Sequence, residues 1–362
     1  MAAAHNFKVA YIGGGSRFVI TFLHGLVNCV DKLKFLGSSI LLSLMDPNLP
    51  RATEMAQYAE IVAKQTGLPL SVEVTNERKV AIDGAHLIIY SAGVHEKLNT
   101  IRAMFDAVLG GHVEPDSCPG MAMEGVAHWE IVEKLAEETR TLAPNAIFCT
   151  LANPTDVLAA AVERRFGIKS VGVCVEVPQL KRWLAVHLKV KVSDVELLDY
   201  IGVNHIGYVL RWTVKGEDAT SLLRERLMEL MNSDQWDPWN DAFAQFFFAT
   251  GYLRTSPYHH LPYRQDWDEE MQERRRAFYE RTYPMSWGEY QQRELTKALA
   301  EWKMIPEEGL DIPSSMLTPY PYPDTGQTLG ELVVGLAGGV SSPFSSSAQN
   351  GESNRLYRPT FG

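Results

Sequence analysis

Short apolar runs alternate with amphipathic segments through the first 170 residues of the chain. The amphipathic segments carry apolar residues at helical spacing. Most of the runs are nearly continuous in apolar residues, which is typical of strands that are buried on both faces of a parallel sheet. Strands are predicted at residues 7–12, 40–45, 70–74, 86–90 and 146–151, and helices at residues 17–30, 51–65 and 124–141. The alternation predicts an α/β fold with a doubly wound parallel sheet.

A second region begins near residue 170. Strands are predicted at residues 171–173, 195–201 and 208–214, a helix at 179–188 and a turn at 216–218. Residues 222–302 are helical in composition and rich in aromatic side chains, whereas prolines, glycines and serines dominate from residue 306. The chain is therefore expected to have three parts: an α/β domain at 1–170, an α+β domain rich in helices at 171–330, and a flexible C-terminal tail at 331–362.

Bulk composition narrows the class of protein. The apolar content of 46% and the charged content of 22% are typical of a soluble globular protein. No apolar stretch reaches the ~20 residues that span a bilayer, so we expect no membrane segment. A net charge of −10 without a basic face argues against nucleic acid as a partner. Four cysteines without CxxC spacing favour a reduced, cytoplasmic setting.

A glycine turn follows the first predicted strand, in the sequence KVAYIGGGS at residues 8–16. Glycines let the backbone approach a pyrophosphate, and the next helix points its amide groups at that anion. Asp46 ends the second predicted strand, where an acid binds a ribose 2′-hydroxyl and disfavours a 2′-phosphate. Residues 1–170 are therefore predicted to be a Rossmann-type NAD-binding domain. The alternative is a glycine turn that only packs the helix against the sheet. The residues predicted to contact NAD in this domain are Gly13, Gly14, Gly15, Ser16, Arg17, Asp46, Gly93 and Asn153.

Two residues with metal-binding side chains follow later strands. Cys174 comes after residues 171–173, and His205 comes after residues 195–203. Ligand crevices in such folds lie outside the carboxyl ends of the strands, so both side chains could reach one site. One thiolate and one imidazole suit a borderline divalent ion with open positions for substrate oxygens. Taken singly, Cys174 could be a small buried hydrophobic residue and His205 a loop histidine.

Four motifs together resemble glycoside hydrolase family 4, or a sister group of its clan such as the NAD-dependent sulfoquinovosidases. The motifs are the glycine turn, LANPTD at 151–156, GVCVEVP at 172–178 and GVNHIG at 202–207, and the resemblance covers about residues 7–265. The family contains NAD- and metal-dependent glycosidases. The resemblance implies a fold like that of the lactate and malate dehydrogenases.

The resemblance also implies a redox route to hydrolysis of a small-molecule glycoside. Family enzymes oxidise the sugar C3 hydroxyl by hydride transfer to NAD, and the ketone acidifies the C2 proton. A base removes that proton, the C1 substituent leaves by elimination, water adds, and the hydride returns to C3. The two-carboxylate mechanism of most glycosidases is not used.

Several residues take roles from this resemblance. Cys174 and His205 would hold Mn²⁺ or another divalent metal, while Asn153, Asn204 and Arg264 would contact the sugar. Tyr258 is the first candidate for the base and Tyr263 the second, with His259 and His260 as further candidates. Glu176 departs from the family pattern, and it could either protonate the leaving group as a substitute acid or only cap a loop. If the sugar carries an anionic group at C6, Arg254, Arg264 and Lys181 could supply the matching positive charge.

Two other functions remain open at this point. One is a 2-hydroxyacid dehydrogenase of the malate or lactate type, with Arg102 and His205 in the substrate site. That function leaves Cys174 without a role. The other is a non-catalytic NAD-binding regulator, which would need no metal. The aromatic helices also suggest a homodimer or homotetramer.

Overall fold

The computed structural model describes residues 6–16, 18–94, 120–203, 206–233, 236, 240–255, 273, 277 and 323–338. These residues form two compact units. The first unit holds the described residues up to Cys174 together with 323–338. The second unit holds those from Val175 to 277. Each unit has its own sheet and its own core, so the two are described separately.

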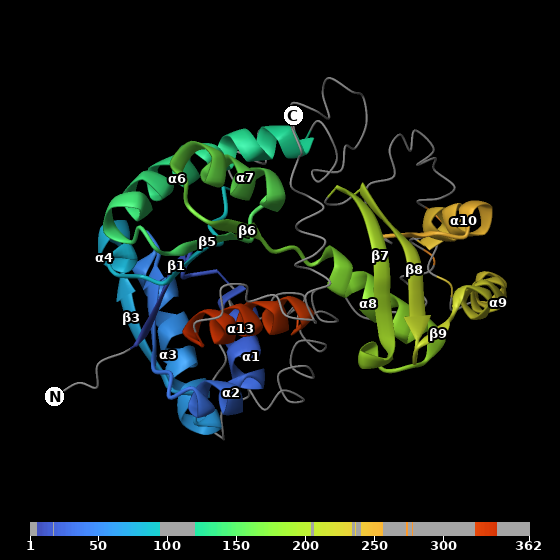
Figure 1. Ribbon diagram of the computed structural model, residues 1–362, viewed down its shortest axis with the longest axis horizontal. Helices are drawn as coiled ribbons and strands as arrows, with labels where there is room; N and C mark the ends of the chain where they lie inside the picture. The colour runs from blue at the N-terminus through green and yellow to red at the C-terminus, as the bar shows by residue number, and fades with distance from the viewer. Residues whose placement is uncertain are drawn as a thin grey trace. The chain divides into compact units, whose positions relative to one another are not determined.

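The first unit is built on a six-stranded sheet in which every pair of neighbouring strands is parallel (Figure 1). The strands are β1 (Phe7–Ile12), β2 (Ile40–Met45), β3 (Leu70–Thr75), β4 (Leu87–Tyr90), β5 (Ile147–Thr150) and β6 (Ser170–Gly172). Their order, β3-β2-β1-β4-β5-β6, is that of a doubly wound dinucleotide-binding sheet. The predicted fold class is confirmed, with strand ends within one residue of the prediction.

Helices cover both faces of this sheet, and the apolar runs supply side chains to both. Val9 and Tyr11 of β1 belong to one core, and Ala10 and Ile12 belong to the other. The first core packs against α1 (Phe18–Asn28), α3 (Leu49–Thr66) and α13 (Pro323–Ala337), with α2 (Val30–Phe35) at its rim. The second core packs against α4 (Arg78–Ile82), α6 (Gly120–Leu142) and α7 (Thr155–Phe166).

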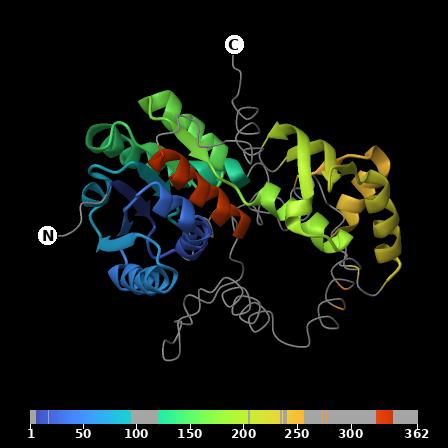
Figure 2. The same ribbon diagram turned by 60° about the horizontal axis from the view of Figure 1, so that its bottom comes forward.

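Helix α13 lies directly against α1, although about 300 residues separate them in the chain (Figure 2). Leu329, Leu332 and Val333 of this helix are buried in the first core. Composition predicted a flexible tail from residue 331, and this is wrong for residues 331–337. The reason is that Gly326 and Gly330, earlier in the same helix, face α1, and that Leu332 and Val333 are buried in the first core.

The second unit pairs a small antiparallel sheet with three helices. The sheet contains β7 (Val195–Val203), β8 (Ile206–Val214), β9 (Glu217–Asp218) and β10 (Leu253–Arg254), in the order β10-β8-β7 with β9 paired to β8. The helices are α8 (Glu176–Leu188), α9 (Thr220–Met231) and α10 (Asp241–Thr250), and a 3-10 turn, η1 (Val192–Asp194), precedes β7. The core includes the buried Trp183 and Trp212.

Three elements differ from the sequence prediction. The predicted helix at 17–30 is divided at Cys29 into α1 and α2. The predicted turn at 216–218 is a turn only at its start, because residues 217–218 pair with β8 as β9. Strand β10 interrupts the stretch predicted to be helical from residue 222, since Leu253 and Arg254 pair with Val209 and Tyr208 of β8.

Candidate functional site

Backbone hydrogen bonds fix the glycine turn after β1 to the end of β2. The amides of Gly13 and Gly14 both donate to the Met45 carbonyl, at 2.9 and 2.8 Å. Gly13 has a φ of +97°, and a Cβ there would lie 2.7 Å from the backbone nitrogen of Ala92. A side chain is therefore excluded both by conformation and by space. The turn presents bare backbone between β1 and β4, where this sheet order places a dinucleotide.

The turn then leads into α1. The Gly15 amide donates to Asp46 Oδ2 at 2.9 Å, and the Ser16 amide donates to the Gly13 carbonyl at 2.8 Å. Ser16 Oγ accepts a hydrogen bond from the Phe18 amide at 3.3 Å. The first turn of α1 carries no acidic side chain, so the positive end of the helix dipole can attract an anion. The cradle fits the pyrophosphate of a dinucleotide.

Asp46 lies directly after β2 and is half-buried. Besides the bond from Gly15, its Oδ1 accepts a hydrogen bond from the Asn48 amide at 2.8 Å. Both carboxylate oxygens are thereby held in place, and each has a lone pair left for a further donor. The side chain is therefore preorganised to accept from a ribose hydroxyl, which is the role that the sequence predicts for it.

Other predicted residues follow strands of the same sheet. Gly93 is exposed and comes after β4, and Asn153 is half-buried and comes after β5. The peptide bond from Asn153 to Pro154 is cis. Because all six strands are parallel, these residues lie at the same edge of the sheet as the glycine turn.

Cys174 follows β6 at this edge and is half-buried. Gly172, two residues earlier, packs so closely that a Cβ there would lie 2.7 Å from the carbonyl carbon of Thr155. Thr155 starts α7, two residues after Asn153. The fold therefore brings the segments of Asn153 and Cys174 together, as the sequence predicts for residues of one site.

The other described cysteines have a different environment. Cys149 is fully buried, and burial raises the pKa of its thiol to about 12. Burial also raises the pKa of the Cys29 thiol. A buried thiol with a raised pKa is a poor metal ligand and a poor nucleophile. Among the described cysteines, Cys174 is thus the best suited to bind a metal.

Glu176 lies at the start of α8 in the second unit, with only 4% of its surface exposed. Its carboxylate accepts a hydrogen bond from the hydroxyl of Thr255. The neighbouring Arg254 is 5% exposed, and burial lowers its pKa, while the nearby Tyr208 and Glu176 raise it. Thr255 could not be identified from the sequence, because nothing in the sequence shows that this residue meets one 79 positions away.

Nine predicted site residues lie outside the described residues, so the structure does not test their placement: Arg17, Arg102, Asn204, His205, Tyr258, His259, His260, Tyr263 and Arg264. Within the described part of the chain, no cluster of three or more histidine, cysteine, aspartate or glutamate side chains could hold a metal ion. The donor chemistry of Cys174 with His205 still fits a borderline divalent ion.

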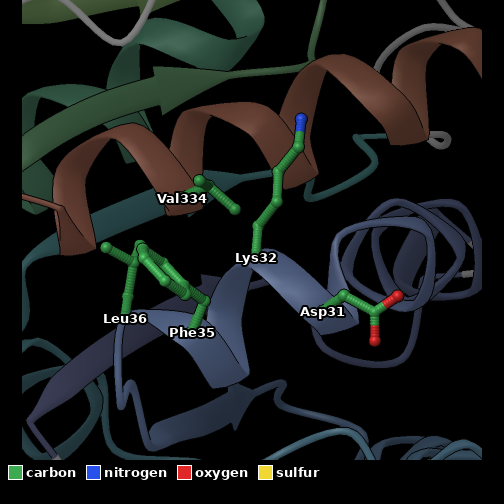
Figure 3. A pocket seen from close by; sticks show the side chains of 5 residues that line it. All are labelled: Asp31, Lys32, Phe35, Leu36 and Val334. Atoms are coloured by element: carbon green, nitrogen blue, oxygen red, sulfur yellow. The ribbon is translucent and has the colours of Figure 1, made fainter.

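A groove of about 440 Å³ lies between α2 and α13 in the first unit, lined by Asp31, Lys32, Phe35, Leu36 and Val334 (Figure 3). It contains no predicted site residue. Helix α2 leads into the start of β2, so the groove lies at the amino end of that strand, opposite the glycine turn.

Two family models match the chain. The model of the family 4 glycosyl hydrolases matches residues 8–190, and that of the family 4 glycosyl hydrolase C-terminal domain matches residues 200–324. The chain belongs to the family 4 glycosyl hydrolases. Helix α13 begins where the match to the family's C-terminal domain ends. The family predicted from the four motifs is therefore confirmed.

Curated relatives share low identity with this family 4 chain. A 6-phospho-beta-glucosidase of Escherichia coli (strain K12) is 22% identical over 219 residues, which cover 59% of this chain and 48% of the relative. An alpha-glucosidase of Erwinia rhapontici is 25% identical over 227 residues, covering 60% and 49%. A malate dehydrogenase of Ehrlichia canis is 26% identical over 200 residues, covering 53% of each chain. The chain thus spans about half the length of the curated relatives it matches.

Solved structures agree with the fold. The 6-phospho-beta glucosidase from Thermotoga maritima, solved with manganese, NAD⁺ and glucose-6-phosphate, has a TM-score of 0.63 at 19% identity, covering 90% of this chain and 73% of that one. A 6-phospho-alpha-glucosidase from gut microorganisms, solved with NAD and glucose-6-phosphate, also has a TM-score of 0.63, at 18% identity and with coverage of 90% and 75%. Among the described residues, no helix is both long and apolar enough to cross a bilayer.

Proposed function

We propose that this protein is an NAD- and divalent-metal-dependent glycosidase that hydrolyses its substrate through transient oxidation at sugar C3. The observation that carries the proposal is the glycine turn of a family 4 chain. Its bare backbone lies at the same sheet edge as Asn153 and Cys174. This geometry supports a dinucleotide and a metal thiolate within one site.

Bound NAD would supply a reversible hydride acceptor, and a divalent cation would supply a Lewis acid for the hydroxyl that is oxidised. The glycine turn and Asp46 would orient the dinucleotide, and Asp46 would favour NAD over NADP. Cys174 and His205 would hold the cation, and Asn153 would contact the sugar beside it. Tyr258, or else Tyr263, would remove the proton from sugar C2.

We further propose that the substrate carries an anionic group at C6. The E. coli relative is named a 6-phospho-beta-glucosidase, and the Thermotoga maritima structure contains glucose-6-phosphate. In this chain, Arg254 is a buried cation of the second unit. A buried guanidinium suits a phosphate, carboxylate or sulfonate better than a neutral hydroxymethyl group. Another relative, from Erwinia rhapontici, is named an alpha-glucosidase, without a phosphate in its name. A glycoside with a plain hydroxyl at C6 is therefore the comparison that the test needs.

A screen of nitrophenyl glycosides tests both the proposed mechanism and the proposed substrate class. Both anomers are offered with hydroxyl, phosphate, carboxylate or sulfonate at C6, under reducing conditions, with NAD and Mn²⁺ added together, singly or not at all. We expect nitrophenol release only when both are present, and fastest with an anionic C6 group. Cleavage that is independent of NAD would refute the mechanism, whereas equal rates for all C6 groups would refute only the substrate class.

The matches to malate dehydrogenases favour one other candidate, a 2-hydroxyacid dehydrogenase. That enzyme would release one NADH for each hydroxyacid oxidised. The glycosidase regenerates its NAD within each turnover, so absorbance at the NADH wavelength should not accumulate. Incubation with malate and lactate therefore distinguishes the two functions in a single assay.

A further inference from the structure

Thr255 follows the last residue of β10, and its backbone amide and its side-chain hydroxyl both continue the pairing with β8. Its backbone amide donates to the Gly207 carbonyl at 3.0 Å. Its Oγ accepts from the Gly207 amide at 3.2 Å, in the position that a backbone carbonyl would take in a regular ladder. Thr255 is 0% exposed. A hydroxyl this deeply buried must be satisfied on its donor side as well.

Two acceptors lie within reach of that hydroxyl proton: the Gly207 carbonyl, at 3.2 Å from Thr255 Oγ, and the carboxylate of Glu176, which is the nearer of the two. Burial of a carboxylate is costly unless hydrogen bonds compensate it. The position of Glu176 in the first turn of α8 adds the favourable field of the helix N-terminus. Glu176, Thr255 and Gly207 therefore form a continuous buried chain of hydrogen bonds within the second unit.

The ring of Tyr200 lies close to Gly207. A Cβ on Gly207 would lie 2.6 Å from the Cζ atom of that ring. Gly207 pairs with Gly202, and Val203 pairs with Ile206 in the β7–β8 hairpin. These paired residues flank Asn204 and His205 in the sequence.

We propose that Thr255 and Glu176 are positioning residues, which fix the paired ends of β7 and β8 that flank Asn204 and His205 in the sequence. The inference rests on the proposed function, because it makes the affinity for the metal depend on this hydrogen-bond chain. Glu176 is also two residues after Cys174 in the sequence. One buried carboxylate therefore restrains the segments that follow both predicted metal ligands. This role differs from the proton-donor role that the sequence alone suggests for Glu176.

The test uses the full chain and the substitution Thr255→Val, which keeps the shape of the side chain and removes the hydroxyl. Thr255→Ser is the matched control, because it keeps the hydroxyl. Two properties are measured without substrate: hydrogen exchange at residues 203–208, and the affinity for Mn²⁺ from the electron paramagnetic resonance of the free ion. NAD affinity serves as a check on folding.

We expect Thr255→Val to speed exchange of the Gly207 amide and to weaken Mn²⁺ binding by roughly 10- to 100-fold, as is common for residues that orient a metal ligand. NAD affinity should not change, and Thr255→Ser should behave as the unaltered protein does. Unchanged exchange in Thr255→Val would overturn the positioning role. Faster exchange with unchanged Mn²⁺ affinity would overturn the link to the metal.

Two further outcomes separate this inference from others. If the unaltered chain does not bind Mn²⁺, the proposed function fails, while the exchange rates still decide whether Thr255 holds the hairpin. Glu176→Gln keeps an oxygen that can accept from Thr255. A loss of kcat in Glu176→Gln, with unchanged exchange and Mn²⁺ affinity, would overturn the claim that Glu176 acts only by positioning and would assign proton transfer to it.

Discussion

The crossing of α1 and α13 offers a sharp test of how the first unit is assembled. Gly25 of α1 faces Gly326 and Gly330 of α13, and each of the three would place a Cβ against the backbone of the opposite helix. A Cβ on Gly330 would meet the carbonyl oxygen of Gly25. Backbone atoms cannot rotate away as a side chain can, so Gly330→Ala must push the two helices apart.

The expected loss can be estimated from the contacts that separate. Overpacking of a well-packed interface costs typically 1–3 kcal/mol. An alanine in a helix interior recovers up to about 1 kcal/mol relative to glycine. The displaced helix also carries Leu329, Leu332 and Val333, which are at most 1% exposed. We therefore expect Gly330→Ala to lower the free energy of unfolding by about 2 kcal/mol.

The assay is urea unfolding followed by far-UV circular dichroism, with Gly335→Ala as the matched control. Gly335 lies in the same helix and is half-exposed. Five residues at ~100° each place it roughly on the opposite side of α13 from Gly330. Gly335→Ala should leave the free energy of unfolding unchanged or raise it slightly. If Gly330→Ala is as stable as Gly335→Ala, the close crossing is not what holds α13 in place.

Three further predictions concern the site in the first unit. Gly13→Ala should abolish NAD binding, because a Cβ there meets the backbone after β4. Gly84→Ala is the control and should keep NAD binding, because Gly84 also has a positive φ, of +65°, but open space around it. Equilibrium dialysis measures the NAD affinity of both variants. Asp46→Ala should weaken NAD binding by roughly tenfold and reduce the preference over NADP, as fluorescence titration would show. Iodoacetamide at pH 8 should modify Cys174 and spare Cys149. The pKa of about 12 leaves only about one in ten thousand of the Cys149 thiols as the reactive thiolate. Mass spectrometry identifies the modified cysteines.

Each of these predictions has a specific counter-result. NAD binding by Gly13→Ala equal to that of Gly84→Ala would remove the steric argument for the turn. An unchanged ratio of NAD to NADP affinity in Asp46→Ala would remove the role of its carboxylate. The alkylation is done in Cys118→Ser, because Cys118 lies outside the described residues. Added Mn²⁺ should slow modification of Cys174, and equal labelling with and without the ion would argue against a metal thiolate.

Most strands of the first unit could be predicted from the sequence because they are apolar on both faces, whereas β3 alternates apolar residues with Ser71, Glu73 and Thr75. That pattern is local, and it requires no knowledge of what the strand packs against. The division between α1 and α2 could not be read in the same way. No side chain caps the start of α2 at Cys29, so no local signal marks the break.

Helix α13 shows why composition can mislead. Its glycines gave the segment the composition of a linker, and their actual role appears only when α1 lies opposite them. The contact between Glu176 and Thr255 was hidden for a similar reason, since the fold alone joins residues 79 positions apart. In contrast, the glycine turn and Asp46 could be predicted from local sequence. The turn lies between the end of the first strand and the start of the first helix, and Asp46 directly follows the second strand.

The most direct test of the central claim is the fate of the hydrogen at sugar C2. The full chain is incubated in D₂O with NAD, Mn²⁺ and the best aryl glycoside, and the released sugar is analysed by NMR before it is fully consumed. Oxidation at C3 followed by removal of the C2 proton predicts deuterium at C2 of the product and slower cleavage of a C2-deuterated substrate. Cleavage that leaves the C2 hydrogen in place, at a rate that deuteration does not change, would contradict the account.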